Sequence, residues 1–201
     1  MISSELKKSL NQYEDYISRH GVDLDVVNAY HLATFWANEK DNDIETALKI
    51  APRAKELMNQ YVINGARGDI WELEKFCFAN KTGHEMVDKW YEILKLEAPH
   101  LLDSYMLYIE KNRPPKTRFY KPRRKTLKLV TDKLQMLEDD LLDELFVHMP
   151  ARVGKSQELT LATSWKCARD TEASNLYVTY KEGLGGAFID GVMEIWTDPT
   201  Y

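Results

Sequence analysis

The residues Gly154, Lys155 and Ser156 have the types and the order that hold the phosphate groups of a nucleotide. A glycine lets the backbone approach a phosphate closely, a lysine ammonium reaches the β- and γ-phosphates, and a serine hydroxyl binds Mg²⁺. Where a helix begins on such residues, the backbone N–H groups also point at the phosphates. The sequence therefore predicts a site for ATP and Mg²⁺ at Val153, Gly154, Lys155 and Ser156, with Ser156 as the metal ligand.

One position of this loop departs from the usual phosphate-binding pattern. That pattern has a glycine five residues before Gly154, where this chain has Met149. The tripeptide alone is a weak signal, because roughly one chain in ten of this length carries Gly-Lys-Ser or Gly-Lys-Thr by chance. A helix that merely happens to begin with these residues is the alternative interpretation.

Arg152 lies inside the loop and has two interpretations. A guanidinium there would stabilise charge on the transferred phosphate, as arginine fingers do. It would equally well face solvent or a partner subunit. Lys155 and Arg152 are the predicted catalytic residues, and the role of Arg152 is the more open of the two.

The segments around the loop have the order of a phosphate-loop domain. The apolar run Glu144–Met149 predicts a buried strand, and a helix is expected from Gly154 to about Ala168. Asn175–Tyr180 predicts a second strand, followed by a helix from about Gly183 to Trp196. Alternating strands and helices favour a parallel sheet covered by helices. Residues 111–201 are therefore predicted to form part of a P-loop ATPase domain.

Residues 1–110 show one helical pattern after another, separated by breaks at Gly21, Gly65, Gly83 and Pro99. They carry no catalytic constellation and no paired histidine spacing. This region is expected to be an accessory domain or a protein-docking module. The predicted fold class is thus α/β, with an all-helical N-terminal region followed by an incomplete P-loop parallel sheet with flanking helices.

A basic run extends from Lys111 to Lys133 and contains ten lysines or arginines but only one acidic residue, Asp132, although the whole chain carries a net charge of −5. Such a run would follow a nucleic-acid backbone or form a solvated face beside the nucleotide site. Phe119 and Tyr120 are the aromatic residues within it. An aromatic side chain just ahead of the loop would also be placed to cover an adenine ring.

The remaining composition argues against export and against a membrane span. No apolar run reaches the roughly 18 residues that cross a bilayer, and the N-terminus lacks the apolar core of a signal peptide. Cys77 and Cys167 show no metal-ligand spacing, which fits a reducing compartment.

Three strings of this chain resemble the large terminase subunit of tailed bacteriophages: Tyr108–Pro115, Arg118–Lys125 and Glu144–Ser156. In that family the phosphate loop commonly lacks the first glycine and reads much like Met-Pro-x-Arg-x-Gly-Lys-Ser, so Met149 supports the resemblance. Leu176–Tyr180 also resembles the next strand of the family. The resemblance covers about half of the chain, from Leu101 onward.

The resemblance implies an ATP-driven motor that pumps double-stranded DNA into a procapsid, in the cytoplasm of an infected bacterium. It implies contacts with the portal protein, the small terminase subunit and further copies in a homo-oligomeric ring, and no membrane. Lys155 and Ser156 would contact phosphate and magnesium, and Arg152 would stabilise the γ-phosphate. Tyr120 and Arg124 lie where the family places its adenine-contacting segment, although the family often has glutamine at the position of Arg124.

The family also has a strand that ends in Asp-Glu, a coupling motif and a nuclease domain. None of these follows Ser156 in this sequence, so we expect the chain to be an N-terminal fragment of such a motor that is inactive alone. Two alternatives stay open. One is another P-loop ATPase that acts on nucleic acid, such as a helicase, and the other is a helical protein-binding adaptor with a vestigial loop.

Overall fold

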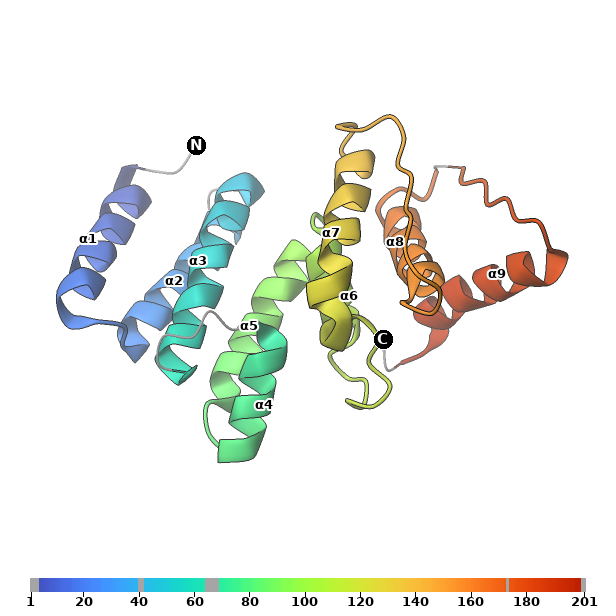
Figure 1. Cartoon of the computed structure of the whole chain (residues 1–201). Helices are drawn as coiled ribbons and strands as arrows, with labels where there is room; N and C mark the ends of the chain where they lie inside the picture. The colour runs from blue at the N-terminus through green and yellow to red at the C-terminus, as the bar shows by residue number, and fades with distance from the viewer. Residues whose placement is uncertain (1–3, 40–41, 64–68, 173, 200–201) are drawn as a thin grey trace. The chain divides into compact units, whose positions relative to one another are not determined.

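In the computed structural model of the protein, the described residues are 4–39, 42–63, 69–172 and 174–199, and every regular element among them is an α-helix (Figure 1). The chain divides into two compact units, Met1–Ile93 and Leu94–Tyr201. The helices are α1 (Ser4–His20), α2 (Leu24–Glu39), α3 (Ile44–Ile63), α4 (Ile70–Asn80), α5 (His84–Glu97), α6 (Leu102–Ile109), α7 (Tyr120–Glu138), α8 (Lys155–Arg169) and α9 (Glu182–Thr197).

In the first unit, α2 and α3 pack along each other. Both helices bury alanines, whose small side chains let two helices approach closely. A carboxylate connects three helices, because Glu14 of α1 accepts two hydrogen bonds of 2.9 Å from Arg53 of α3 and another from the Tyr30 hydroxyl of α2.

Within the described residues, no helix is long and apolar enough to cross a membrane.

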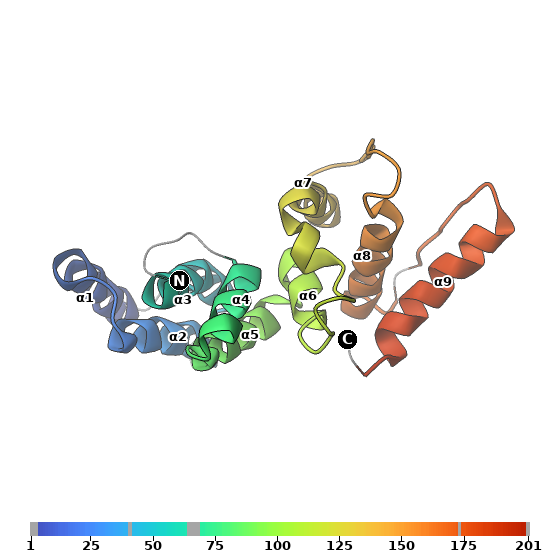
Figure 2. The same ribbon diagram turned by 60° about the horizontal axis from the view of Figure 1, so that its bottom comes forward.

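In the second unit, α6, α7, α8 and α9 pack in sequence, with α8 between α7 and α9 (Figure 1, Figure 2). The buried Trp165 of α8 donates its indole N–H to the carbonyl of Ala98 at 2.7 Å. The Ser164 hydroxyl lies 2.9 Å from the Tyr105 hydroxyl of α6. These two contacts fix the position of α8, the helix that follows the predicted phosphate loop.

The start of α7 depends on a residue outside the helix. The N-cap residue of α7 is Phe119, whose side chain makes no capping hydrogen bond. The buried carboxylate of Glu110 accepts the backbone N–H of Phe119 at 2.6 Å, that of Tyr120 at 2.8 Å and that of Lys121 at 3.0 Å. Pro122 follows and has no N–H to leave unsatisfied. Glu110, the C-cap residue of α6, thus holds the first turn of α7 against the end of α6.

The predicted α/β fold with a parallel sheet is wrong, because the described residues contain no strand and no sheet. The segments Glu144–Met149 and Asn175–Tyr180 belong to no regular element, and Tyr180 lies in a bend. Their apolar side chains face solvent instead of a core. The largest exposed fractions are those of Phe146 (80%), Val178 (78%), Leu176 (90%) and Tyr180 (94%).

The physical reason lies in what a parallel sheet requires. Parallel strands are buried on both faces and pair less strongly per residue than antiparallel strands, so a short pair alone is marginal. Here Tyr177 instead stacks on Phe188 of α9, with ring centroids 3.9 Å apart. The segment therefore lies along a helix rather than beside another strand. The two helices of this region agree with the prediction, since α8 and α9 begin and end within one residue of the expected bounds.

The cap on α7 predicts a large effect of Glu110→Ala. Removing the carboxylate leaves buried N–H groups without an acceptor, and we expect the free energy of unfolding to fall by about 2–4 kcal/mol. Urea denaturation followed by far-ultraviolet circular dichroism measures it. The matched control is Glu182→Ala, at an exposed position in the first turn of α9, where the loss should be about 0.5 kcal/mol or less. Equal losses in the two variants would show that Glu110 does not cap α7.

Candidate functional site

The predicted phosphate loop leads into α8 through two residues in left-handed backbone conformations. Gly154 has a φ of +107° and is the N-cap of α8, and Arg152 has a φ of +64°. Glycine adopts such angles without the steric cost that a β-carbon brings. The turn brings the chain from the segment before Met149 directly onto the first residue of α8, Lys155.

The N-terminus of α8 carries no side-chain cap. Its first intrahelical hydrogen bond joins the N–H of Glu158 to the carbonyl of Gly154, at 3.0 Å. The N–H groups of Lys155, Ser156 and Gln157 precede that bond and so belong to the orphan donors of the helix start. Together with the helix dipole, these donors favour a bound anion.

The Lys155 side chain folds back over the loop. Its ammonium donates a hydrogen bond of 2.7 Å to the carbonyl of Met149. Lys155 and Ser156 are both exposed, while Val153 is half-buried. An ammonium held by one exposed carbonyl can move to a phosphate at small energetic cost, because a charge-assisted bond to an anion replaces it.

A phenyl ring from the start of α7 lies against the loop. A β-carbon at position 154 would come within 2.5 Å of the Phe119 ring, so a larger residue would strain the backbone and displace the ring. The Arg123 guanidinium stands 5.1 Å from the centroid of the same ring and donates to the Phe119 carbonyl. The structure therefore brings Phe119 and Arg123 to the predicted phosphate loop. Phe119 lies 35 residues before Gly154 in the sequence.

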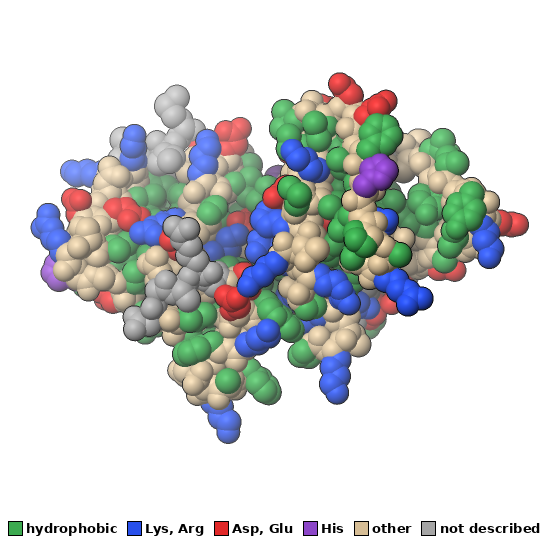
Figure 3. All heavy atoms as spheres, viewed as in Figure 1, with side chains coloured by type: hydrophobic (Ala, Val, Ile, Leu, Met, Phe, Trp, Pro, Cys, Tyr) green, Lys and Arg blue, Asp and Glu red, His purple; other side chains and the backbone are tan. Residues whose placement is uncertain are grey.

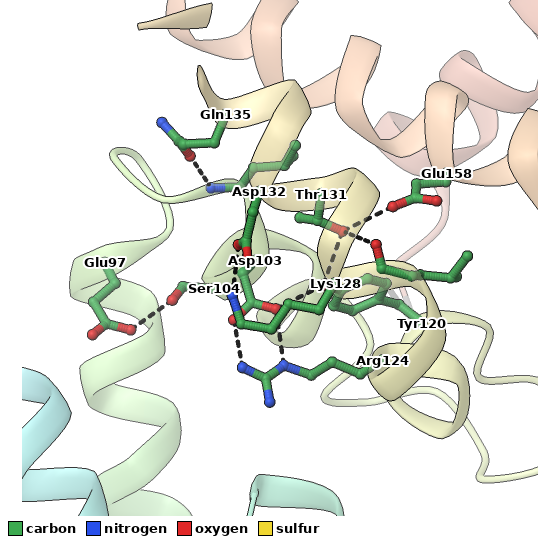
Figure 4. A network of polar contacts seen from close by, with 12 residues as sticks. Glu97, Asp103, Ser104, Tyr120, Arg124, Lys128, Thr131, Asp132, Gln135 and Glu158 are labelled. Atoms are coloured by element: carbon green, nitrogen blue, oxygen red, sulfur yellow. Dashed lines mark hydrogen bonds and ion pairs between the residues drawn. The ribbon is translucent and has the colours of Figure 1, made fainter. Parts of the chain in front are cut away.

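Tyr120 and Arg124 are engaged in a polar network between α6 and α7 (Figure 4). The fully buried Tyr120 donates its hydroxyl to Asp103 at 2.7 Å and lies 3.0 Å from the Thr131 hydroxyl. Arg124 makes a bidentate pair with Asp103, at 2.9 and 2.7 Å. An adenine contact by either residue would require its side chain to leave this network, and the contact stays a prediction.

The same network determines the charge of Asp103. Burial raises the pKa of its carboxyl, but the hydrogen bonds and charge of Arg124 outweigh burial, so the pKa lies below its ordinary value. Burial raises the pKa of the Tyr120 hydroxyl, which therefore stays protonated and able to donate. The pair Asp103–Arg124 is thus a fixed ion pair that holds α7 on α6.

Glu158 of α8 is a residue that sequence reasoning missed. It is 1% exposed, and its Oε1 accepts a hydrogen bond of 2.8 Å from the Thr131 hydroxyl of α7 (Figure 4). Its Oε2 is buried without a hydrogen-bond partner among the described residues. Burial raises the pKa of this carboxyl from 4.5 to about 7. The burial of Glu158 could have been predicted from its spacing, because it shares a helix face with the buried Leu161 and Trp165.

Two predictions about this site stay predictions. The Arg152 side chain is exposed at the loop, where either of its predicted roles is sterically open. Ser156 is the one predicted magnesium ligand, and the described residues contain no group of three or more His, Cys, Asp or Glu side chains that could hold a metal ion. A bound Mg²⁺ would therefore take most of its ligands from the nucleotide and water, as Mg²⁺ commonly does.

Comparison with protein-family models, curated proteins and solved structures finds no match to this chain. The function is therefore argued from the loop, its helix and the side chains around them.

The buried Glu158 predicts an unusual dependence of stability on pH. Folding raises the pKa of Glu158, so the folded state keeps a proton that the unfolded state releases. The free energy of unfolding therefore falls as pH rises from about 4.5 to about 7, and is level above about 7. The total decrease in the free energy of unfolding over this pH range is about 3 kcal/mol. In Glu158→Gln this dependence disappears, and the variant should be more stable than the parent near pH 8 but not near pH 4, in urea denaturation.

Glu182→Gln, an exposed acid in the first turn of α9, is the control and should leave the pH profile of the parent unchanged. A Glu158→Gln profile that runs parallel to that of the parent would contradict the buried, protonated carboxyl.

Proposed function

We propose that the loop Met149–Ser156 binds ATP with Mg²⁺, and that the chain contributes this nucleotide grip to a DNA-packaging motor of the large-terminase type. One observation carries the proposal: the uncapped N-terminus of α8 follows a left-handed Gly154 and presents exposed Lys155 and Ser156. Orphan N–H groups, an ammonium and a hydroxyl at one helix start are the set that a magnesium–triphosphate needs.

Each residue of the loop has a defined part in the proposal. The N–H groups from Val153 to Ser156 bind phosphate oxygens, and the Gly154 backbone approaches them closely because it lacks a β-carbon. Lys155 leaves the Met149 carbonyl and binds the β- and γ-phosphates. The Ser156 hydroxyl binds Mg²⁺, and Arg152 stabilises charge on the γ-phosphate.

Tyr120 and Arg124 support the site indirectly in this arrangement. Their hydrogen bonds to Asp103 hold the first half of α7 on α6, and this places Phe119 against Gly154. The phenyl ring, rather than the buried Tyr120, is the aromatic group next to the loop. Tyr120 and Arg124 are thus positioning residues for the nucleotide site, and an adenine contact by them is a further proposal that needs a rearrangement of α7.

The wider function follows the resemblance of residues 101–201 to the large terminase subunit. Double-stranded DNA, the portal protein of the procapsid and the small terminase subunit are the proposed partners, and the cytoplasm of the infected host is the proposed location. The proposal for the chain itself is limited to nucleotide binding. Hydrolysis requires carboxylates that activate water, and no Asp-Glu pair follows Ser156 in this sequence.

The nucleotide proposal predicts that Lys155→Ala weakens ATP binding by about a hundredfold, because a charge-assisted contact between an ammonium and phosphate contributes about 2–3 kcal/mol. Titration with a fluorescent ATP analogue and Mg²⁺ measures the Kd. The matched control is Lys181→Ala, an exposed lysine just before α9 that should bind as the parent does. Unchanged affinity in Lys155→Ala, or no binding by the parent chain, would refute the proposed site.

A further inference from the structure

A pocket of about 660 Å³ lies within the second unit, between the end of α5, helix α6 and the end of α8. Proteins bind small organic molecules in pockets of roughly 300–1,000 Å³ with mostly apolar walls. We call this one the α8 pocket. The residues that give it its chemistry are Lys95, His100, Tyr105, Tyr108, Trp165 and Arg169, and no acidic residue is among the described residues that line it.

Two rings in the wall of the α8 pocket are held in place by hydrogen bonds. The buried Trp165 donates its indole N–H to the carbonyl of Ala98 at 2.7 Å. The Ser164 hydroxyl donates to the carbonyl of Leu161 at 2.7 Å, so the Tyr105 hydroxyl, 2.9 Å from it, is the donor of that pair. Because both rings are fixed before a ligand arrives, a flat apolar molecule binds against them with little loss of side-chain entropy.

Two cationic side chains line the α8 pocket, one from α5 and one from α8. The Lys95 ammonium is exposed, and no hydrogen bond or ion pair of it is found among the described residues. The Arg169 guanidinium lies 4.5 Å from the centroid of the Trp165 ring and 3.6 Å from a carboxylate oxygen of Glu138. Glu138 also pairs with Lys166, so its single negative charge is shared between two cations. The charge of Lys95 and part of the charge of Arg169 are thus left for a ligand.

Helix dipoles do not cancel this positive charge. Lys95 stands in the last turn of α5, and Lys166 and Arg169 stand in the last turn of α8, where bases offset the dipole. Each helix end carries about half of an elementary charge, so the two ends together supply about one negative charge. The three bases exceed Glu138 by about two charges. The α8 pocket therefore keeps a net charge of about +1, which one negative group on a ligand would neutralise.

From this arrangement we infer that the α8 pocket binds a small organic anion with a flat aromatic body and one singly charged acid group, such as a carboxylate. The body packs against the Tyr105 and Tyr108 rings, and the acid group binds Lys95 and Arg169. The Tyr108 hydroxyl and the His100 ring form no hydrogen bond among the described residues, so they supply further donors. A cation would be repelled by the same charges.

Fluorescence titration with two matched probes tests the inference. Anilinonaphthalene sulfonate has a flat aromatic body and one negative charge, and phenylnaphthylamine has the same rings without the charge. We expect the parent chain to bind both probes at the α8 pocket, because both have the flat body, and the two probes should compete. A parent chain that does not bind the sulfonate overturns the inference.

Substitutions in the α8 pocket separate the charge from the apolar wall. Lys95→Gln and Arg169→Gln should each raise the Kd of the sulfonate about tenfold and leave that of the neutral probe within about twofold, because a charge-assisted contact is lost. Ala168→Phe fills the pocket and should weaken both probes. Its matched control is Ala187→Phe, at an exposed position of α9 outside the pocket. Sulfonate affinity that is unchanged in Lys95→Gln, or is reduced equally by the two phenylalanine variants, overturns the inference.

A second apolar surface has to be distinguished from the α8 pocket. Val178 (78%) and Ile189 (61%) are exposed, and Figure 3 shows hydrophobic side chains over α9 and the segment before it. Lys181, which is exposed between them in the sequence, is the base that an anionic probe would meet there. Lys181→Gln should leave the Kd of the sulfonate unchanged. A loss of affinity in Lys181→Gln without a loss in Lys95→Gln would place the probe on this surface and overturn the inference.

The inference does not depend on ATP binding. Arg169 lies about 21 Å along α8 from Lys155, too far for one small ligand to contact both side chains. Saturating Mg²⁺ and ATP should therefore leave the sulfonate titration unchanged. Displacement of the probe by ATP would place a nucleotide in the α8 pocket and overturn the assignment of a singly charged ligand. Failure of the phosphate loop is detected separately, by the ATP titration of Lys155→Ala.

Discussion

The hydrogen bonds between the Glu110 carboxylate and the first turn of α7 are the constraint on which the second unit depends. They fix where α7 begins, and so place Phe119 beside Gly154 and Tyr120 in the core. Three charge-assisted bonds to one buried carboxylate outweigh the unfavourable basic residues nearby. Without this cap, the face of α7 that receives α8 would lose its register, and the loop would lose the ring that supports Gly154.

The contact between α7 and α8 includes a buried polar pair in which one oxygen atom has no hydrogen-bond partner among the described residues. Thr131 donates to Glu158, whose second oxygen is buried without a partner among the described residues. A protonated carboxyl is tolerated there far better than a carboxylate, because burial penalises charge. Besides the contacts of Trp165 and Ser164, α8 is therefore attached to α7 through a carboxyl group whose pKa is about 7. The loop itself is stabilised mainly by backbone turns and by the Phe119 ring, and it stays open at the helix N-terminus.

The sequence predicted the helices of this region but not the fold class. Gly154 followed by a helical pattern located the start of α8, because both signals are local. The apolar runs at 144–149 and 175–180 predicted strands, but both lie outside regular structure, because strand pairing depends on neighbours that such a pattern does not identify. Glu110 was not identified as a cap because it lies nine residues before Phe119. The adenine contact of Tyr120 comes from the resemblance alone and stays a prediction; the sequence did not indicate that Asp103 of α6 and Thr131 would hydrogen-bond its hydroxyl, because these residues lie 17 and 11 positions away.

Amide hydrogen exchange measures most directly whether the N-terminus of α8 binds the phosphates of ATP, as we propose. With saturating Mg²⁺ and ATP, the account predicts slower exchange of the N–H groups of Val153, Gly154, Lys155 and Ser156, because phosphate oxygens accept them. The amides of α1 to α4 should exchange as before. Unchanged exchange at Val153–Ser156 under these conditions, or protection located elsewhere in the chain, would contradict the account.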